Sequence, residues 1–361
     1  MELDSTEPQW ESVSFDKVFA RPTLKKKKIK TSIYMDFGKI PIIDQSKNAI
    51  AGWTDDENFR MKVSNNGFIV FGDHTRVVKM VLSDFALGAD GTQLLEVNDN
   101  FDTSYMYYAL SNKDIPNTGY NRHFKFIREM TFMRPPIREQ MAIAEALSDI
   151  DGLILITKNA ILKTENTKQS ILYPLLTGKA SKSNVAKWQH QPLGEILEYE
   201  QPTKYLVNTN KHKEFGKYPV LTAGKSFILG YTDDEYGVYT KEETILFDDF
   251  TTDTKFVDFP FKVKSSACKM LTPRTGAINL RFVFEAIKHL KFQPYDHKRY
   301  WISEYSKLLL PLPDKHEQDS IAEVIKDFDL KLSLLKSELA KYEWLKQGMM
   351  HDLLTGEVRL V

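Results

Sequence analysis

The sequence predicts an α+β (mixed α/β) fold, in which two globular domains are separated by two long α-helices that form an antiparallel coiled coil. The chain has 361 residues, which corresponds to about two domains at ~100–200 residues each. An internal repeat recurs at a shift of 178 residues, and each copy ends in a long stretch with apolar residues spaced alternately four and three apart. A pseudo-twofold rotation relating the two copies makes the helices antiparallel.

The two halves of the chain have a set of sequence segments in common. The motif Glu-Gln-x-x-Ile-Ala-Glu-x-x-x-Asp-x-Asp occupies residues 139–151 and recurs without a gap at residues 317–329. Other segments recur at the same shift: Trp10 as Trp188, Gly-Lys-x-Pro at 38–41 as 216–219, Gly-x-Thr-Asp-Asp-Glu at 52–57 as 230–235, and Leu-Leu-Thr-Gly at 175–178 as 353–356. The residues between these segments diverge.

The apolar seams predict two long coiled-coil helices. The first seam runs from Ile143 to Ile171 and the second from Ile321 to Met349. Lys168 interrupts the first seam, and Lys346 interrupts the second at the matching position. A buried lysine is costly, so each is expected to be paired, to extend its ammonium to solvent, or to mark where the seam opens; simple exposure is the alternative.

The ends of these helices carry recognisable signals. Asp314, with Glu317 three residues later, has the spacing of a capping box. Pro174 is expected to break or kink the first helix near its end. Prolines stand at the start of the first helix and a glycine follows each helix, at Pro135, Pro136, Gly178 and Gly356.

The segments before each helix are predicted to form short strands and turns. Strands are expected at residues 67–71, 218–222 and 243–247, and helices at residues 101–110 and 277–290. The predicted boundaries are residues 1–134 for the first domain, 135–183 for the central helical region, 184–312 for the second domain and 313–361 for the C-terminal helical region.

Composition excludes several classes of protein. The apolar fraction of 42% and the charged fraction of 27% predict a folded core. The apolar stretch at residues 152–156 is too short to span a membrane, and the acidic N-terminal segment does not resemble a signal peptide, so a soluble, cytoplasmic protein is expected. A single cysteine, Cys268, excludes an internal disulfide and a cysteine-rich zinc site. With 49 basic and 49 acidic residues, only local patches favour nucleic acid.

No motif predicts a catalytic, cofactor-binding or metal-binding site. Residues 224–226 read Gly-Lys-Ser, but Pro219 stands where a phosphate-binding loop requires a glycine. His316 and Glu317 begin a zinc-protease pattern that Ser320 ends. No glycine loop for a dinucleotide or a methyl donor follows a strand. The sequence therefore predicts a protein that is not an enzyme and has no cofactor.

The order globular domain, long helix, globular domain, long helix, with Glu-Gln near each helix start and Leu-Leu-Thr-Gly at each end, resembles the specificity subunit of type I restriction-modification systems. The resemblance covers nearly the whole chain. It implies a non-catalytic reader of double-stranded DNA with two target-recognition domains. It also implies partners: methyltransferase (modification) subunits that dock on the helices, and restriction (motor and nuclease) subunits. The gapless helix repeat predicts two methyltransferase subunits per chain, and the divergent domains predict an asymmetric, bipartite DNA target.

Cationic, amide and hydroxyl side chains in predicted loops are the candidate DNA contacts, because such groups bind phosphates and base edges. In the first domain they are Lys25, Lys26, Lys27, Lys28, Lys30, His74, Thr75, Arg76, Asn121 and Arg122. In the second they are Thr222, Lys225, Thr251, Thr252, Lys255, His297, Lys298 and Arg299. Arg122 and Arg299 lie 177 positions apart, which favours a shared role such as phosphate binding. A surface ion pair or a domain-packing contact is an equally good interpretation of any one of them.

Two other functions fit parts of the pattern. One is a restriction-modification enzyme with its own nuclease or methyltransferase activity, against which the missing motifs argue. The other is a coiled-coil scaffold with two protein-binding domains. Salt-dependent DNA binding in the presence of a methyltransferase distinguishes the three.

Overall fold

The computed structural model describes residues 10–22, 28–63, 66–89, 91–119, 121–179, 188–207, 212–224, 226–241, 243–290, 292–296 and 298–360. The chain divides into two compact units, Met1–Asn159 with Ser337–Val361, and Ala160–Lys336. We call residues 10–134 of the first unit the first head, and residues 188–312 of the second unit the second head. The mixed α/β class and the internal repeat predicted from the sequence are confirmed.

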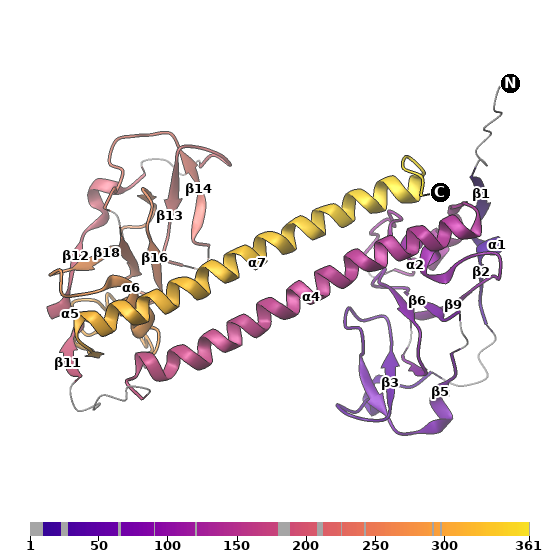
Figure 1. The fold of residues 1–361 in the computed structure, drawn as a ribbon, viewed down its shortest axis with the longest axis horizontal. Coiled ribbons are helices and arrows are strands. Elements are labelled where there is room, and N and C mark those ends of the chain that lie inside the picture. Colours follow the sequence, from indigo (N-terminus) through magenta and orange to yellow (C-terminus); the bar gives the residue numbers. More distant parts are fainter. Residues whose placement is uncertain are drawn as a thin grey trace. The chain divides into compact units, whose positions relative to one another are not determined.

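The first head is built from short strands in two four-stranded sheets and one two-stranded ribbon (Figure 1). The strands are β1 (Glu11–Ser14), β2 (Phe19–Ala20), β3 (Ile40–Ile43), β4 (Gly52–Thr54), β5 (Arg60–Met61), β6 (Phe68–Gly72), β7 (Val78–Val81), β8 (Phe85–Leu87), β9 (Thr92–Val97) and β10 (Thr131–Arg134). The helices are α1 (Phe15–Val18), η1 (Thr31–Ile33), η2 (Glu57–Phe59), α2 (Thr103–Ser111) and α3 (Phe124–Arg128). The sheet orders are β2-β9-β6-β7 and β4-β3-β8-β5, and β1 pairs with β10.

The second head repeats this plan, but its second sheet has three strands instead of four. Its strands are β11 (Gln189–Pro192), β12 (Leu197–Glu200), β13 (Tyr218–Leu221), β14 (Ile228–Thr232), β15 (Thr244–Asp248), β16 (Thr254–Val257), β17 (Lys262–Val263), β18 (Cys268–Pro273) and β19 (Leu309–Leu312). Its helices are α5 (Leu193–Ile196), η4 (Pro202–Tyr205), α6 (Leu280–Ile287) and η5 (Tyr305–Lys307). The sheet orders are β12-β18-β15-β16 and β14-β13-β17, and β11 pairs with β19.

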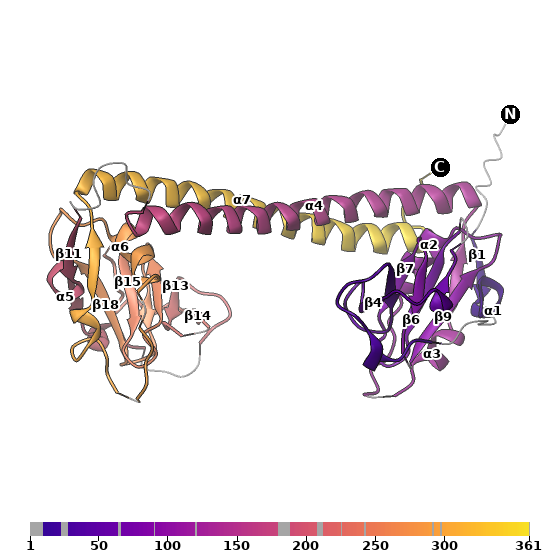
Figure 2. The same cartoon turned by 90° about the horizontal axis from the view of Figure 1, so that it is seen from below.

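A short helix in each head packs beside the long helices: α2 in the first unit and α6 in the second (Figure 2). Asp102 caps α2 by accepting the N–H of Tyr105 at 2.8 Å, and Asn279 caps α6 by accepting the N–H of Phe282 at 3.0 Å. These caps begin the helices two or three residues later than predicted, since Asp and Asn satisfy the free N–H groups of a first turn.

The repeated Glu-Gln motif connects each long helix to its own head. Gln140 accepts the N–H of the cap residue Asp102 at 2.9 Å and donates to the carbonyl of Pro135 at 2.9 Å. In the second unit Gln318 does the same for Asn279 at 2.8 Å and for Pro313 at 2.9 Å. The glutamines are buried, so the bonds satisfy polar groups that water cannot reach.

The glutamate of the motif binds the repeated tryptophan. Trp10 donates its indole N–H to Glu139 at 3.0 Å, and Trp188 donates to Glu317 at 3.1 Å. The predicted cap at Asp314 is confirmed, because its carboxylate accepts the N–H of Glu317 at 2.9 Å. The pairing of the Glu317 carboxylate with an indole was not predicted by the capping-box pattern.

The long helices are α4 (Ile137–Leu176) and α7 (Lys315–Thr355), and they pair antiparallel within each unit, as predicted. In the first unit the interhelical ion pairs are Lys346–Asp151 at 2.6 Å and Lys158–Glu343 at 2.8 Å. In the second unit they are Lys168–Asp329 at 2.5 Å and Lys336–Glu165 at 3.1 Å. A shift of 178 converts each pair of one unit into a pair of the other, with the two helices exchanged. Both seam lysines are therefore paired, which was one of the expected outcomes.

Of the break or kink predicted at Pro174, the break is wrong, because α4 continues to Leu176. Leu172 and Leu176 are buried in the core of the second unit on either side of the proline. Their burial holds the last turn in place although Pro174 removes one backbone hydrogen bond. No helix in the described ranges has the length and apolarity needed to cross a membrane.

Candidate nucleic-acid interface

Each head has a tight turn directly after a buried central strand. The turns are residues 72–76, after β6, and residues 248–252, after β15, 176 positions apart. Among the described non-glycine residues, positive φ angles occur at Arg76, with 63°, and at Thr252, with 61°. Each donates its N–H to the carbonyl four positions earlier, at 2.7 and 2.9 Å. Left-handed backbone is unfavourable for such residues and concentrates at functional sites, so its repetition marks these turns.

In the first head a buried aspartate joins the turn to the loop that precedes α3. Asp73 is 2% exposed; its carboxylate accepts the N–H of Phe124 at 2.8 Å and its carbonyl accepts the N–H of His123 at 2.8 Å. Nδ1 of His74 lies 3.2 Å from the carbonyl oxygen of Asn121. The junction thus brings together the predicted DNA-binding residues of the turn and of the loop.

The second head builds the same junction with different side chains. The carboxylate of Asp249 accepts the N–H of Trp301 at 2.8 Å, and its carbonyl accepts the N–H of Tyr300 at 2.8 Å. Nζ of Lys269 lies 3.0 Å from the same carboxylate, and both side chains are 2% exposed. The junction joins the two segments that carry the predicted residues Thr251, Thr252, Lys298 and Arg299.

Gln45, which the sequence reasoning missed, holds the turn of the first head from the other side. Its side-chain carbonyl accepts the N–H of His74 at 3.1 Å, and its main-chain carbonyl accepts the hydroxyl of Thr75 at 2.5 Å. A Cβ added at Gly91 would lie 2.7 Å from the amide of Gln45 and from the ring of His74. Only glycine therefore leaves room for this cluster.

Arg21, also missed, is a preoriented arginine at the first junction. Its guanidinium donates to the side-chain carbonyl of Gln93 at 3.2 Å and lies 5.2 Å from the ring centroid of Phe124. Gln93 in turn donates to the carboxylate of Asp73 at 3.4 Å. The side chain of Arg21 is exposed, so it presents hydrogen-bond donors to solvent from a fixed position.

Tyr199 occupies the position of Arg21 in the second head, 178 residues later. Nζ of Lys269 lies 4.8 Å from its ring centroid, and the ring of Trp301 lies 6.5 Å away. The shifts of 176 to 178 residues that relate these positions were the available signal. A comparison of residues related by these shifts, made at every strand end, would have identified Arg21 and Gln93 as positions where the heads differ.

The remaining predicted residues have varied surroundings. Lys28 donates to the carbonyl of Thr92 at 2.5 Å, beside Gln93, and Lys30 is exposed. Arg122 and Arg299 are both exposed on the loops that the junctions hold. Lys25, Lys26, Lys27, Lys225 and His297 lie outside the described residues.

Some predicted residues are engaged within the protein. Arg76 donates to the carbonyl of Ile115 at 2.9 Å. Lys298 lies 2.6 Å from Glu304, and its hydrogen bonds to Glu304 and to Tyr295 raise the pKa of its ammonium. Both side chains therefore have partners that a DNA phosphate would have to displace.

Two predicted residues of the second head lie elsewhere. Thr222 belongs to the turn after β13, where its hydroxyl accepts the N–H of Gly224 at 3.4 Å, and Lys255 lies on β16. Across the described ranges, no hydrogen bond or ion pair joins either side chain to Asp249.

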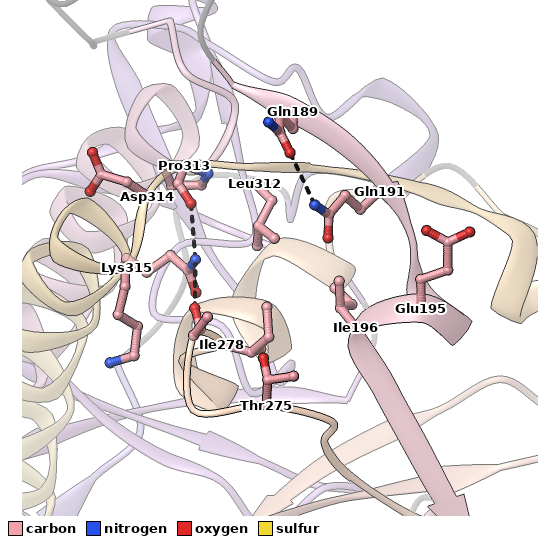
Figure 3. Close-up of a pocket in the computed structure, with 12 residues that line it drawn as sticks. Gln189, Gln191, Glu195, Ile196, Thr275, Ile278, Leu312, Pro313, Asp314 and Lys315 are labelled. Carbon is pink, nitrogen blue, oxygen red and sulfur yellow. Dashed lines mark hydrogen bonds between the residues drawn. The ribbon is translucent and has the colours of Figure 1, made fainter.

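The second unit has a polar pocket of about 460 Å³ at the start of α7, and Figure 3 shows its lining. The side-chain amide of Gln318 donates hydrogen bonds to the carbonyl of Pro313, at 2.9 Å, and to that of Ala277, at 3.3 Å. Gln191 donates to Gln189 at 3.2 Å. These bonds connect the helix start to the head, so the lining is structural, and none of the described residues that line it is a predicted DNA contact.

Two features bear on metal and thiol chemistry. His351, Asp352 and Glu357 bring potential ligand atoms within 4.8 Å of one another, close to the end of α7, with the His and Glu side chains exposed. Exposed acidic groups gather commonly without an ion. Burial raises the pKa of the Cys268 thiol to about 11, which makes it unreactive at neutral pH.

Comparisons with known proteins identify the family of this chain. The family described as "Type I restriction modification DNA specificity domain" matches residues 8–166 and again residues 186–343. The specificity subunit of the Escherichia coli type I restriction enzyme EcoR124I/EcoR124II is 47% identical over 157 residues, which cover 41% of this chain and 39% of that protein. The chain thus aligns with less than half of that relative. The specificity subunit of the Methanocaldococcus jannaschii enzyme MjaVIII is 25% identical and aligns over 84% of this chain and 81% of its own.

Solved structures support the fold. The S subunit of a type I restriction-modification system from M. genitalium has a TM-score of 0.70 at 18% identity, with 98% of both chains covered. A chain from a structure described as the basis of complex assembly and conformational transition of the type I R-M system has a TM-score of 0.51 at 12% identity, covering 98% of this chain and 99% of that one.

Proposed function

This chain belongs to the type I restriction-modification DNA specificity family, and we propose that its two heads each read one half of an asymmetric, bipartite sequence in double-stranded DNA. Residues 1–134 and 184–312 serve as the target-recognition domains, and residues 135–183 and 313–361 serve as the helical regions. One observation carries the proposal: the same turn-and-loop junction is built twice, with different exposed side chains. A scaffold kept constant under variable contacts is what two readers of different half-sites require.

The exposed donors around each junction suit DNA. Arg122 and Arg299 occupy equivalent loops and have the charge for phosphate contacts, which position a protein without reading sequence. Arg21 and Asn121 in the first head have the side-chain types that read guanine and adenine. Tyr199 and Thr251 are exposed in the second head and present hydroxyls instead.

The chemistry of the complex belongs to its partners. Exposed apolar side chains on the long helices, among them Leu155, Ile156 and Trp344 in the first unit and Leu162 and Leu334 in the second, are suited to docking. We assign these surfaces to two methyltransferase subunits, one in each unit, with restriction subunits joining that assembly. The specificity chain itself supplies recognition and no catalytic group.

The test combines a methylome with binding measurements. Methylated sites in cells that contain this chain and its methyltransferase should be bipartite, with different half-sites. In vitro, R122A and R299A should each lower the slope of log affinity against log salt by about one, whereas K62A, an exposed lysine away from the junctions, should not. A contiguous or palindromic methylated motif, or slopes unchanged in both arginine variants, would contradict the proposal.

A further inference from the structure

Each head exposes a phenylalanine at the same place in the repeat. Phe37 is 85% exposed and Phe215, 178 residues later, is 79% exposed. Both begin the sequence Phe-Gly-Lys, which leads into β3 of the sheet β4-β3-β8-β5 or into β13 of the sheet β14-β13-β17. A large aromatic side chain kept in water at both positions gains nothing for folding, which indicates an intermolecular contact.

These two loops, residues 36–39 and 214–217, are held rigidly. The N–H of Lys39 donates to the carboxylate of Asp55 at 2.8 Å, and the N–H of Lys217 donates to Asp233 at 2.9 Å. A Cβ added at Gly38 would lie 2.9 Å from the Cβ of Trp53, so the loop fits closely against β4. A preorganised loop loses little entropy when its aromatic side chain is buried by a partner.

The surroundings of both loops are acidic. The acids repeat position for position: Asp36, Asp55, Asp56 and Glu57 in the first head, and Glu214, Asp233, Asp234 and Glu235 in the second. Several are neutralised, since Arg60 pairs with Glu57 in the first head, and Lys213, Lys262 and Lys217 pair with Asp233, Asp234 and Glu235 in the second. Among the described residues, Asp36, Asp55 and Asp56 in the first head and Glu214 in the second have no ion pair. The negative charge that remains next to each phenylalanine opposes a DNA backbone and suits a protein surface with basic groups.

The repeat itself identifies the kind of partner. At the junctions the heads differ, with Arg21 against Tyr199 and Gln93 against Lys269, whereas the phenylalanine, the glycine, the lysine and the acids are retained in both. A surface kept constant while the DNA-reading side chains change must meet the same partner in both heads. We propose that each loop anchors one copy of the methyltransferase subunit, with Phe37 or Phe215 entering an apolar pocket rimmed by basic groups. This inference rests on the proposed function, and it adds a contact on the heads to the helix surfaces.

The experiment measures assembly without DNA, by native mass spectrometry and titration with the cognate methyltransferase. Wild-type chain should bind two copies. The variants F37A and F215A should each weaken one of the two sites by about tenfold to thirtyfold, and the double variant should weaken both. The control L82A/I302A removes one exposed apolar side chain from each head, 63% and 61% exposed, and should leave assembly unchanged. A wild-type chain that fails to bind two copies would refute the proposed function, not the loops.

A charge reversal separates protein from DNA. The variant D36K/E214K should weaken methyltransferase binding several-fold at low salt, with less effect at high salt. If the loops contact DNA instead, the same variant should tighten DNA binding of the assembled complex. Unchanged methyltransferase affinity in F37A/F215A, with or without loss of DNA affinity, would overturn the inference.

Discussion

At the first junction the carboxylate of Asp73 meets the neutral amide of Gln93, whereas at the second the equivalent Asp249 meets the ammonium of Lys269. The backbone bonds around the two aspartates are the same. In the first head the cation at this junction is Arg21, which is exposed and donates to Gln93. One backbone can therefore hold a cation either as a buried partner of the aspartate or as an exposed hydrogen-bond donor, so that recognition can change without a change of fold.

The largest expected difference between the heads follows from this exchange. In D249N the ammonium of Lys269 stays buried without its carboxylate, which should destabilise the second head by about 3–5 kcal/mol. In D73N the new amide still accepts from Phe124 and faces a neutral glutamine, so the loss should stay near 1 kcal/mol. Native-state hydrogen exchange measures each head separately, through the amides of β15 and β18 against those of β6 and β9. Equal losses of stability in D249N and D73N would contradict the different roles assigned to Lys269 and Gln93.

Much of the fold could be predicted because it rests on periodic and local signals. The gapless repeat of residues 139–151 at 317–329 predicted both long helices, and the apolar seams predicted that they pair. The break that was one of the two outcomes expected at Pro174 does not occur, because burial of the neighbouring leucines outweighs one lost hydrogen bond. Local sequence contains no measure of that burial.

The candidate site could be predicted only in part. His74 and Asn121 were predicted as DNA contacts because polar residues in predicted loops can be recognised from the sequence alone. Asp73 and Gln93 were missed because their partners lie across strands and turns, at separations that only the fold brings together. The repeat offered an indirect signal, since pairs that differ at equivalent strand ends mark the positions where the heads diverge.

The second expected effect concerns the C-terminal segment, which supports only the first unit. Arg359 donates to the buried Glu139 at 2.5 and 2.7 Å, and Trp10 donates at 3.0 Å. R359A leaves the carboxylate with neutral donors only, the indole of Trp10 and the backbone N–H of Leu360, and should cost the first unit about 2–4 kcal/mol. The residue 178 positions earlier, Ser181, lies outside the described residues, and the second unit should be unaffected. Hydrogen exchange of α4 amides near Glu139 is the measurement, with R274A in the second unit as the control.

The same contact predicts a pH dependence. Burial would raise the pKa of Glu139, but the hydrogen bonds from Arg359 and Trp10 outweigh it and hold the pKa below its ordinary value of 4.5. The ionised carboxylate therefore stabilises the fold above pH 4.5, and this stability is lost as the pH falls through the depressed value. In R359A the loss on acidification should shrink. An unchanged acid profile would show that Arg359 is not its source.

A smaller effect, on specificity rather than stability, should follow from replacing the exposed cation of the first head. R21Q removes a preoriented guanidinium, so discrimination at one base pair of the first half-site, which we expect to be guanine, should fall by about 1–3 kcal/mol. The second half-site should stay the same. Y199F, which removes one hydroxyl, should affect only the second half-site. Methylome sequencing determines both half-sites. A change of the second half-site in R21Q would show that Arg21 does not contact the first.

The smallest expected difference lies in the coiled coil, where the repeat gives each unit the same lysine–aspartate pair with a different third partner. Asp151 accepts from Lys346 at 2.6 Å and from the hydroxyl of Tyr108 at 2.9 Å, whereas Asp329 accepts from Lys168 at 2.5 Å and from Arg281. Burial, aided by the bond to Asp151, raises the pKa of Tyr108, so this hydroxyl keeps its proton at neutral pH.

K346A therefore leaves Asp151 with a neutral donor, whereas K168A leaves Asp329 with a cation. These side chains are half-buried, so we expect a cost of about 1 kcal/mol for K346A and about half of that for K168A. The exposed lysines of the second type of interhelical pair, changed in K158A and K336A, are matched controls that should each cost ~0.5 kcal/mol or less. Hydrogen exchange along α7 resolves the two halves of the helix. A larger loss for K168A than for K346A would mean that Arg281 does not compensate, and that the third partner has no part in stabilising the pair.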